Sequence, residues 1–233
     1  TVAELGAMTQ GLDLAGMLKA TSPKIDELIV AQPSAIEGIA KVVGEADLAT
    51  LKDQLTIRSL DNLSDVLPEA IANESFAFYG TTLNGTPERE ARWKRGVGMV
   101  NGMLGEAVGK DYVAQYFPPE SKAKMDDLVH NIRDVLKVRL ENLDWMGADT
   151  KTQALDKLAK FTVKIGYPDK WRDYSKLEIK DDDAYGNAQR AGVFEWRYDV
   201  ERLNGPVDKS EWGMTPQTVN AYYNSVNNEI VFP

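Results

Sequence analysis

The sequence predicts a mainly α-helical fold that ends in a single β-hairpin. Through residues 34–165, apolar side chains recur three and four positions apart, the spacing that places them on one face of a helix. Near the C-terminus the pattern changes to two short β-prone runs, 218–223 and 229–232, joined by the turn-forming residues 224–228. We expect strand in this hairpin. The apolar run 27–32 fits either a further strand or a plain extended segment.

Capping residues indicate where the helices begin. Thr1 and Glu4 fit a capping box, in which each side chain bonds to the backbone amide of the other residue. Serine and aspartate also satisfy free amides at a helix start, and proline is tolerated in the first turn because it has no amide hydrogen. On these grounds, further helices are expected to start at or near Ser34, Asp47, Pro68, Pro87 and Asp149.

Three later helices have clear expected ends. The most regular apolar stripe lies in residues 120–143. The helix that begins at Asp149 is expected to continue to Ile165, because Gly166 and Pro168 then supply a C-terminal stop. A last helix is expected over residues 184–203.

Glycines interrupt two of the expected helices. Gly16 is expected to break the second helix, which lies between Leu12 and Pro23. Another expected helix, over residues 87–116, contains five glycines, and each costs a helix about 1 kcal/mol relative to alanine. These five indicate either close packing against another backbone or a kink; they are Gly96, Gly98, Gly102, Gly105 and Gly109.

Composition disfavours several classes of function. The net charge of −9 argues against a nucleic-acid partner, because phosphate binding needs a basic face. The absence of cysteine excludes disulfides, thiolate metal sites and cysteine nucleophiles. No apolar run reaches the roughly 18 residues of a membrane-spanning helix. His130 is the single histidine, whereas zinc hydrolase sites usually take two or three.

Some polar residues could carry chemistry, but each group has a plainer explanation. His130 fits a ligand or general base, or a partly exposed histidine on a helix. The runs Asp126–Asp127 and Asp181–Asp183 fit carboxylate or calcium sites, or solvated surface. Calcium loops need alternating oxygen ligands and a glycine at the bend, which consecutive aspartates do not provide. The plainer explanation is favoured for all three, so we expect no catalytic, cofactor or metal site in this chain.

The predicted hairpin offers a binding site of a different kind. A strand at the edge of a sheet can bind an extended peptide through main-chain hydrogen bonds. Asn220 and Ala221 lie in the first strand of the hairpin, and an asparagine side chain provides both a donor and an acceptor. The residues alone leave two alternatives open, a peptide-binding edge and an ordinary hairpin.

The hairpin also resembles a known family. Residues Val219–Tyr223, followed by Asn228–Pro233, are similar to the segment just before the zinc motif in the neprilysin and endothelin-converting-enzyme peptidases. Further blocks resemble the same family in the same order, most firmly from Tyr79 onward. These blocks are Tyr79–Thr82, Arg92–Arg95, Val100–Gly102, Glu106–Gly109 with Tyr112–Val113, Leu143–Met146 and Lys164–Pro168.

The resemblance implies a large two-domain zinc metallopeptidase, in which a helical lid limits substrate size and a thermolysin-like domain carries zinc. Residues 1–165 would be part of the lid. Residues 166–233 would be linker helices and the first β-hairpin of the catalytic domain. In this family an Asn-Ala pair on the hairpin binds the substrate backbone, which implies that role for Asn220 and Ala221.

The same resemblance implies that this chain alone is inactive. In the family, the H-E-x-x-H motif, the later glutamate ligand and a transition-state histidine all follow Phe232–Pro233. The zinc cofactor is therefore expected in the parent enzyme and not in this chain. The expected partners are oligopeptide substrates and the rest of the catalytic domain. The lack of cysteine points to a bacterial member, which would be periplasmic or extracellular.

The parent is thus expected to be a zinc-dependent endopeptidase that cleaves oligopeptides. The alternative is a free-standing helical binding or scaffold protein, derived from the lid and without peptidase activity. An H-E-x-x-H motif encoded after Pro233 would favour the peptidase, and its absence would favour the scaffold.

Overall fold

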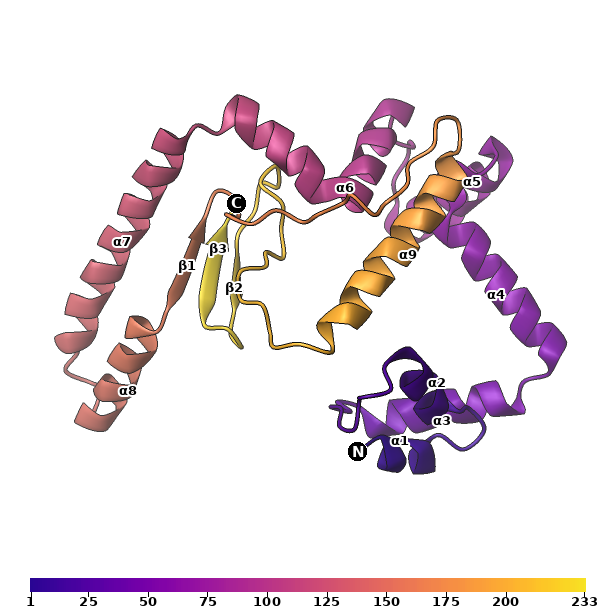
Figure 1. The fold of residues 1–233 in the computed structure, drawn as a ribbon, viewed down its shortest axis with the longest axis horizontal. Helices are drawn as coiled ribbons and strands as arrows, with labels where there is room; N and C mark the ends of the chain where they lie inside the picture. The colour runs from indigo at the N-terminus through magenta and orange to yellow at the C-terminus, as the bar shows by residue number, and fades with distance from the viewer. The chain divides into compact units, whose positions relative to one another are not determined.

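The computed structural model describes all 233 residues and confirms a mainly α-helical fold (Figure 1). Nine α-helices, two short helices of other types and three strands follow one another along the chain. The chain forms two compact units: residues 1–95 with 175–207, and residues 96–174 with 208–233. The expected division at residue 165 concerns the domains of the parent enzyme and stays a prediction.

The first unit is entirely helical. Its core contains Val2, Leu5, Ala40, Ala72 and Ala191. Helix α9 contacts the short helix η1, so residues far apart in the sequence meet within this unit. Its elements are α1 (Val2–Met8), α2 (Leu14–Thr21), α3 (Pro33–Glu45), α4 (Leu48–Asn62), the 3₁₀-helix η1 (Ser64–Val66), α5 (Glu69–Ser75), the π-helix η2 (Phe76–Leu83) and α9 (Ala184–Arg202).

Two predicted caps of the first unit are confirmed. Thr1 and Glu4 form the reciprocal capping box of α1. Asp47 caps α4, and its carboxylate accepts from the amide of Thr50 at 2.9 Å. Both caps depend only on residues within one turn, so the sequence was sufficient to find them.

Other predicted starts are wrong by a few residues. Helix α3 begins at Pro33 and not after Ser34, because proline is itself suited to the first helical position. Gly16 does not break α2; its amide donates to the capping side chain of Asp13 at 2.8 Å. The helix expected at Pro87 begins only at Arg92. Of the two alternatives for the run 27–32, the structure excludes the strand, which leaves the extended segment.

The second unit combines helices with a small sheet. Lys164 and its neighbours, expected at the end of a helix, instead form a strand. Helix α8 begins after Gly147, with Asp149 in its first turn and not at its cap. The elements are α6 (Arg92–Tyr116, which starts in the first unit), α7 (Pro119–Glu141), α8 (Ala148–Ala159), β1 (Thr162–Ile165), β2 (Tyr222–Asn224) and β3 (Glu229–Phe232).

Strand β1 corrects the prediction that strand occurs only in the hairpin and at most in the run 27–32. It pairs in parallel with β3, in the register Thr162↔Glu229 to Ile165↔Phe232. The helical stripe after Asp149 therefore ends at Ala159, and β-branched residues from Thr162 onward join the sheet. A non-local pairing here overrides a local helical pattern, as is common for short β-prone runs.

The glycines of α6 show both of the behaviours that were left open. Leu104 has non-helical backbone angles, so the helix is kinked there. Gly105 and Gly109 lie against the segment 215–217: a Cβ atom on Gly109 would meet Pro216 Cδ at 2.9 Å. Gly98, like Gly96 and Gly102, faces open space.

This difference predicts opposite effects of the same substitution. Gly98→Ala should stabilise the second unit by up to about 1 kcal/mol, because alanine favours helix and meets nothing. Gly109→Ala should destabilise it by about 1–3 kcal/mol, since the rigid proline ring must move. Thermal unfolding of each variant measures both. An equal rise in Tm for the two variants would contradict the close packing of Gly109 against Pro216.

Many apolar side chains remain exposed. The accessible surface is 16564 Å², whereas two separate compact bodies of half this mass would expose about 12,700 Å². The predicted stripe of α7 forms, but Leu128, Ile132 and Val135 stay about half exposed and only Val129 is buried. These helix faces are not covered within the 233 residues. None of the helices combines the length and apolarity that crossing a membrane requires.

Candidate substrate-binding edge

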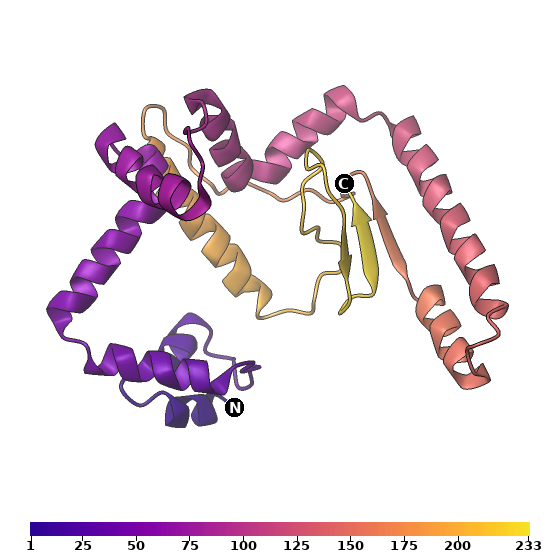
Figure 2. The same cartoon turned by 180° about the vertical axis from the view of Figure 1, so that it is seen from behind.

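The sheet of the second unit has the strand order β1-β3-β2, so β2 forms one outer edge (Figures 1 and 2). Strand β2 pairs antiparallel with β3 in the register Tyr222↔Val231, Tyr223↔Ile230 and Asn224↔Glu229. Val231, in the central strand, is wholly buried. The predicted hairpin is confirmed, and a third strand holds it from the other side.

Asn220 and Ala221 lie immediately before β2, and both are exposed. The strand begins four residues later than the expected Thr218, because Thr218 closes a turn: its amide donates to the Thr215 carbonyl at 3.0 Å. The Asn220 amide in turn donates to the Thr218 carbonyl at 3.1 Å. The predicted pair thus lies at the edge of the sheet, in the two residues that precede the first paired residue of β2, Tyr222.

The side chain of Asn220 is folded toward its own backbone. Its Oδ1 accepts from the Ala221 amide at 2.8 Å, while its Nδ2 has no partner within the chain. A carbonyl oxygen has a second lone pair, so Oδ1 retains capacity to accept. The exposed side chain therefore offers one donor group and one remaining acceptor position to an approaching peptide.

The chain that leads into β2, which we call the edge loop (residues 208–221), is held in several places. At its start, the hydroxyl and amide of Ser210 donate to Asp208, and with Lys170 they hold the pKa of Asp208 at about 2. Farther along, Gln217 Nε2 donates to Asn101 Oδ1 at 3.1 Å and to the Gly105 carbonyl at 3.0 Å. The loop is therefore attached to α6.

Two further bonds attach the edge loop to the sheet. Lys164 Nζ donates to the Glu211 carbonyl at 2.8 Å, and the Gly213 amide donates to Tyr222 Oη at 2.8 Å. Lys164 and Tyr222 both pair with Val231 in the ladder, one from each side. These three residues form one row across the sheet and, because paired residues share a face, they point to the same side.

Sequence reasoning missed a buried ion pair on this face. Lys164 Nζ lies 2.8 Å from Glu229 Oε2, and the side chains are only 9% and 3% exposed. Asn227 Nδ2, in the hairpin turn, lies 3.4 Å from the other carboxylate oxygen. A charged residue at the start of the apolar run 229–232 was a signal, but its partner becomes visible only once β1 is recognised as a strand.

The opposite face of the edge strand is aromatic. Tyr223 stacks on Phe161 with ring centroids 6.0 Å apart, and its hydroxyl donates to Asn228 Oδ1 at 3.1 Å. Lys157 Nζ lies 5.5 Å from the centre of the Tyr223 ring. Asn228 also donates to the Lys157 carbonyl at 2.8 Å. The hairpin is thereby tied to the end of α8.

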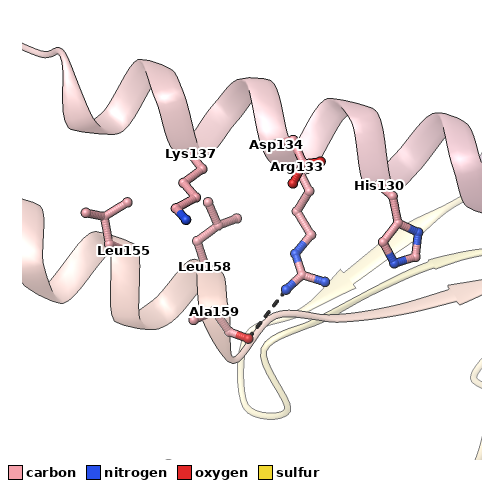
Figure 3. A pocket seen from close by; sticks show the side chains of 7 residues that line it. All are labelled: His130, Arg133, Asp134, Lys137, Leu155, Leu158 and Ala159. Atoms are coloured by element: carbon pink, nitrogen blue, oxygen red, sulfur yellow. Dashed lines mark hydrogen bonds between the residues drawn. The ribbon is translucent and has the colours of Figure 1, made fainter.

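His130 lies in a separate cleft of about 370 Å³ between α7 and α8 (Figure 3). Its ring Nδ1 is 2.8 Å from the Asp126 carbonyl and 3.4 Å from the Asp126 carboxylate, and its side chain is 55% exposed. Arg133 donates to the Ala159 carbonyl at 3.4 Å across the cleft. The apolar lining comes from α8, with Leu155 and Leu158. This is a partly exposed helix histidine, as the plainer explanation predicts.

The acidic runs are not part of any group of side chains arranged to hold a metal ion. Asp183 caps α9 by accepting from the Gly186 amide at 2.9 Å. The hydrogen bond from Arg190, followed by that from Gly186, keeps the pKa of Asp183 below its ordinary value. Across all 233 residues, no group of three or more histidine, cysteine, aspartate or glutamate side chains is arranged to hold a metal ion.

Three of the solved structures that match this fold are named as a zinc metalloprotease. The crystal structure of the Mycobacterium tuberculosis zinc metalloprotease ZMP1 in complex with an inhibitor superposes on the whole chain, with a TM-score of 0.92 and 42% identity. This chain covers 36% of that structure. The name of that protein includes zinc, but this chain contains no group of three or more histidine, cysteine, aspartate or glutamate side chains that could bind it.

Curated relatives agree with this likeness. The neutral endopeptidase of Lactobacillus helveticus is 29% identical over the whole chain, which covers 36% of it. Human neprilysin is 31% identical over 89% of the chain, which covers 29% of that protein. The chain thus spans about a third of the length of these relatives. The profile of peptidase family M13 matches residues 1–168, and the chain belongs to this family.

Proposed function

We propose that this chain is part of a zinc-dependent endopeptidase that cleaves oligopeptides, and that it contributes a substrate-binding edge and much of a size-limiting lid. The observation that carries the proposal is the position of Asn220 and Ala221, which are exposed and lie immediately before the outer strand β2. The family and the peptidase names of the relatives support the reaction class.

The edge fits an extended peptide backbone. Peptides that extend a sheet bind through main-chain hydrogen bonds, and side-chain amides beside the edge can add to them. The free Nδ2 of Asn220 would donate to a substrate carbonyl, and Oδ1 would accept from a substrate amide. These contacts do not depend on substrate side chains, which suits an enzyme acting on varied oligopeptides.

The exposed helix faces support a role within a larger protein. Half-exposed apolar side chains along α7, such as Ile132 and Val135, are unusual for a complete soluble domain. In the proposed enzyme, residues 1–165 form part of the lid, and residues 166–233 connect it to the catalytic domain and begin that domain. The relatives are peptidases, so the free-standing scaffold is not favoured.

Zinc would be held by the remaining part of the catalytic domain, where it would polarise the scissile carbonyl and activate water. This chain would bind and orient the peptide and would be inactive by itself. The resemblance to bacterial relatives supports a periplasmic or extracellular location for the parent enzyme.

Replacing Asn220 by alanine in the full-length protein tests the binding edge. We expect kcat/KM for peptide hydrolysis to fall by a factor that corresponds to about 1–3 kcal/mol, because a polar contact to the substrate backbone is lost. Tm should stay unchanged, since the side chain is exposed and its only bond is to the next residue. Steady-state kinetics and thermal unfolding measure the two quantities.

A matched control is Asn204→Ala, which removes another exposed asparagine outside the sheet. Its kcat/KM should equal that of the unsubstituted enzyme. Two outcomes would contradict the binding role: unchanged activity in Asn220→Ala, or an activity loss accompanied by a fall of many degrees in Tm. Either would make Asn220 an ordinary hairpin residue.

A further inference from the structure

The ammonium group of Lys164 connects three separate parts of the second unit. It belongs to β1, it pairs with Glu229 of β3 at 2.8 Å, and it donates to the Glu211 carbonyl of the edge loop at 2.8 Å. Glu229 also approaches Asn227 in the hairpin turn. The buried ammonium group of Lys164 therefore connects β1, to which it belongs, with β3 and with the edge loop that leads to Asn220.

The edge loop is tied to both ends of one row of side chains. Lys164, Val231 and Tyr222 lie side by side across the three strands. The loop bonds to Lys164 through Glu211 and to Tyr222 through Gly213, while Val231 between them is wholly buried. Tyr222 directly follows the Asn220–Ala221 pair, so this row fixes the sheet end of the edge loop.

A buried ion pair is a costly way to hold a sheet together. The free-energy cost of removing two charges from water can exceed the gain from their mutual attraction. Apolar side chains of similar size often stabilise a fold equally well. What the apolar side chains cannot supply is the directed hydrogen bond from Lys164 to the Glu211 carbonyl. The value of the pair thus lies in fixing the geometry of the edge loop.

We propose that Lys164, with Glu229 as its counter-ion, is a positioning residue that fixes the edge loop and so sets where Asn220 and Ala221 meet the peptide. This inference rests on the proposed binding edge. Lys164 does not touch the substrate; it acts through the loop. A misplacement of about 1 Å at a reacting or binding group can reduce the rate about a hundredfold, so the effect is measurable.

The test replaces both charges at once in the full-length protein, as Lys164→Met with Glu229→Met. No unpaired charge is left, so Tm should change by only a few degrees. We expect kcat/KM for a peptide substrate to fall about tenfold to a hundredfold because the loop loses its attachment. Lys160→Met, which breaks the exposed pair with Asp156, is the control and should change neither quantity.

A second comparison separates positioning from a general structural effect. The methionine pair is combined with Asn220→Ala, where the contact to be positioned is already absent. We expect a further loss of less than about threefold in this background, because residues that act through one another are not additive. An equal loss in both backgrounds, or no loss in either, would overturn the positioning role.

The same series distinguishes the two proposals. If Asn220→Ala alone leaves kcat/KM unchanged, the binding edge itself fails. If Asn220→Ala lowers kcat/KM but the methionine pair does not, only the role of Lys164 fails. Should the methionine pair not fold, Lys164→Gln with Glu229→Gln removes the charges more conservatively; unfolding of both pairs would show a folding role and overturn the inference.

Discussion

Replacing Lys164 alone by methionine, with Glu229 left in place, should lower the free energy of unfolding by about 3–5 kcal/mol. The Glu229 side chain is only 3% exposed, so its carboxylate would lose its cation and could not recover water. The Glu211 carbonyl would lose a hydrogen bond as well. Urea unfolding followed by circular dichroism measures the change.

The comparison with the doubly substituted protein makes this prediction specific. Lys164→Met combined with Glu229→Met should recover most of the lost stability, because it removes the stranded charge. Lys160→Met should change stability by less than about 1 kcal/mol, as expected for an exposed pair. If the single and double substitutions at the buried pair were equally destabilising, the cost would come from packing and not from charge.

The part of the fold that the sequence predicted correctly depends on near neighbours. The caps at Thr1 and Asp47 each form within one helical turn. The hairpin was found because its two strands are separated by a short turn of residues that favour turns. The helices that begin at Pro33 and Arg92 were expected at Ser34 and Pro87, because several neighbouring residues are acceptable at a helix start.

Strand β1 shows why the other parts of the fold could not be predicted from the sequence. Its partner β3 lies more than sixty residues farther along the chain, with α9 between them, and the local pattern favoured a continuing helix. Once β1 was missed, the Lys164–Glu229 pair and the attachment of the edge loop could not be inferred either. These contacts are products of a parallel register, which no local pattern reveals.

The site was predictable only in part. Asn220 and Ala221 followed from the family resemblance, and the structure places them exposed at the sheet edge. Their role toward a substrate stays a prediction, as does the division between lid and catalytic domain. The structure places His130 on helix α7 with a 55% exposed side chain, as the plainer interpretation predicts. The expectation that it binds no metal stays a prediction.

Gly166→Ala should destabilise the second unit by about 2–4 kcal/mol, for two independent reasons. Gly166 ends β1 with a φ angle of +78°, in the left-handed region that disfavours side chains. A Cβ atom there would also clash with Cε1 of Phe117, so the ring would have to move. That ring packs edge-to-face on Tyr167, with the centroids 5.7 Å apart.

The control is Gly85→Ala, because Gly85 also has a positive φ angle but has no close neighbour like Phe117. Its φ angle is +67°, but a Cβ atom would meet nothing within 4 Å. We expect a loss of about 1–2 kcal/mol from the backbone conformation alone. The difference between the two variants, measured by urea unfolding, then gives the cost of displacing Phe117. Equal losses would show that Phe117 moves aside freely, and that the contact with Gly166 does not help fix the end of β1.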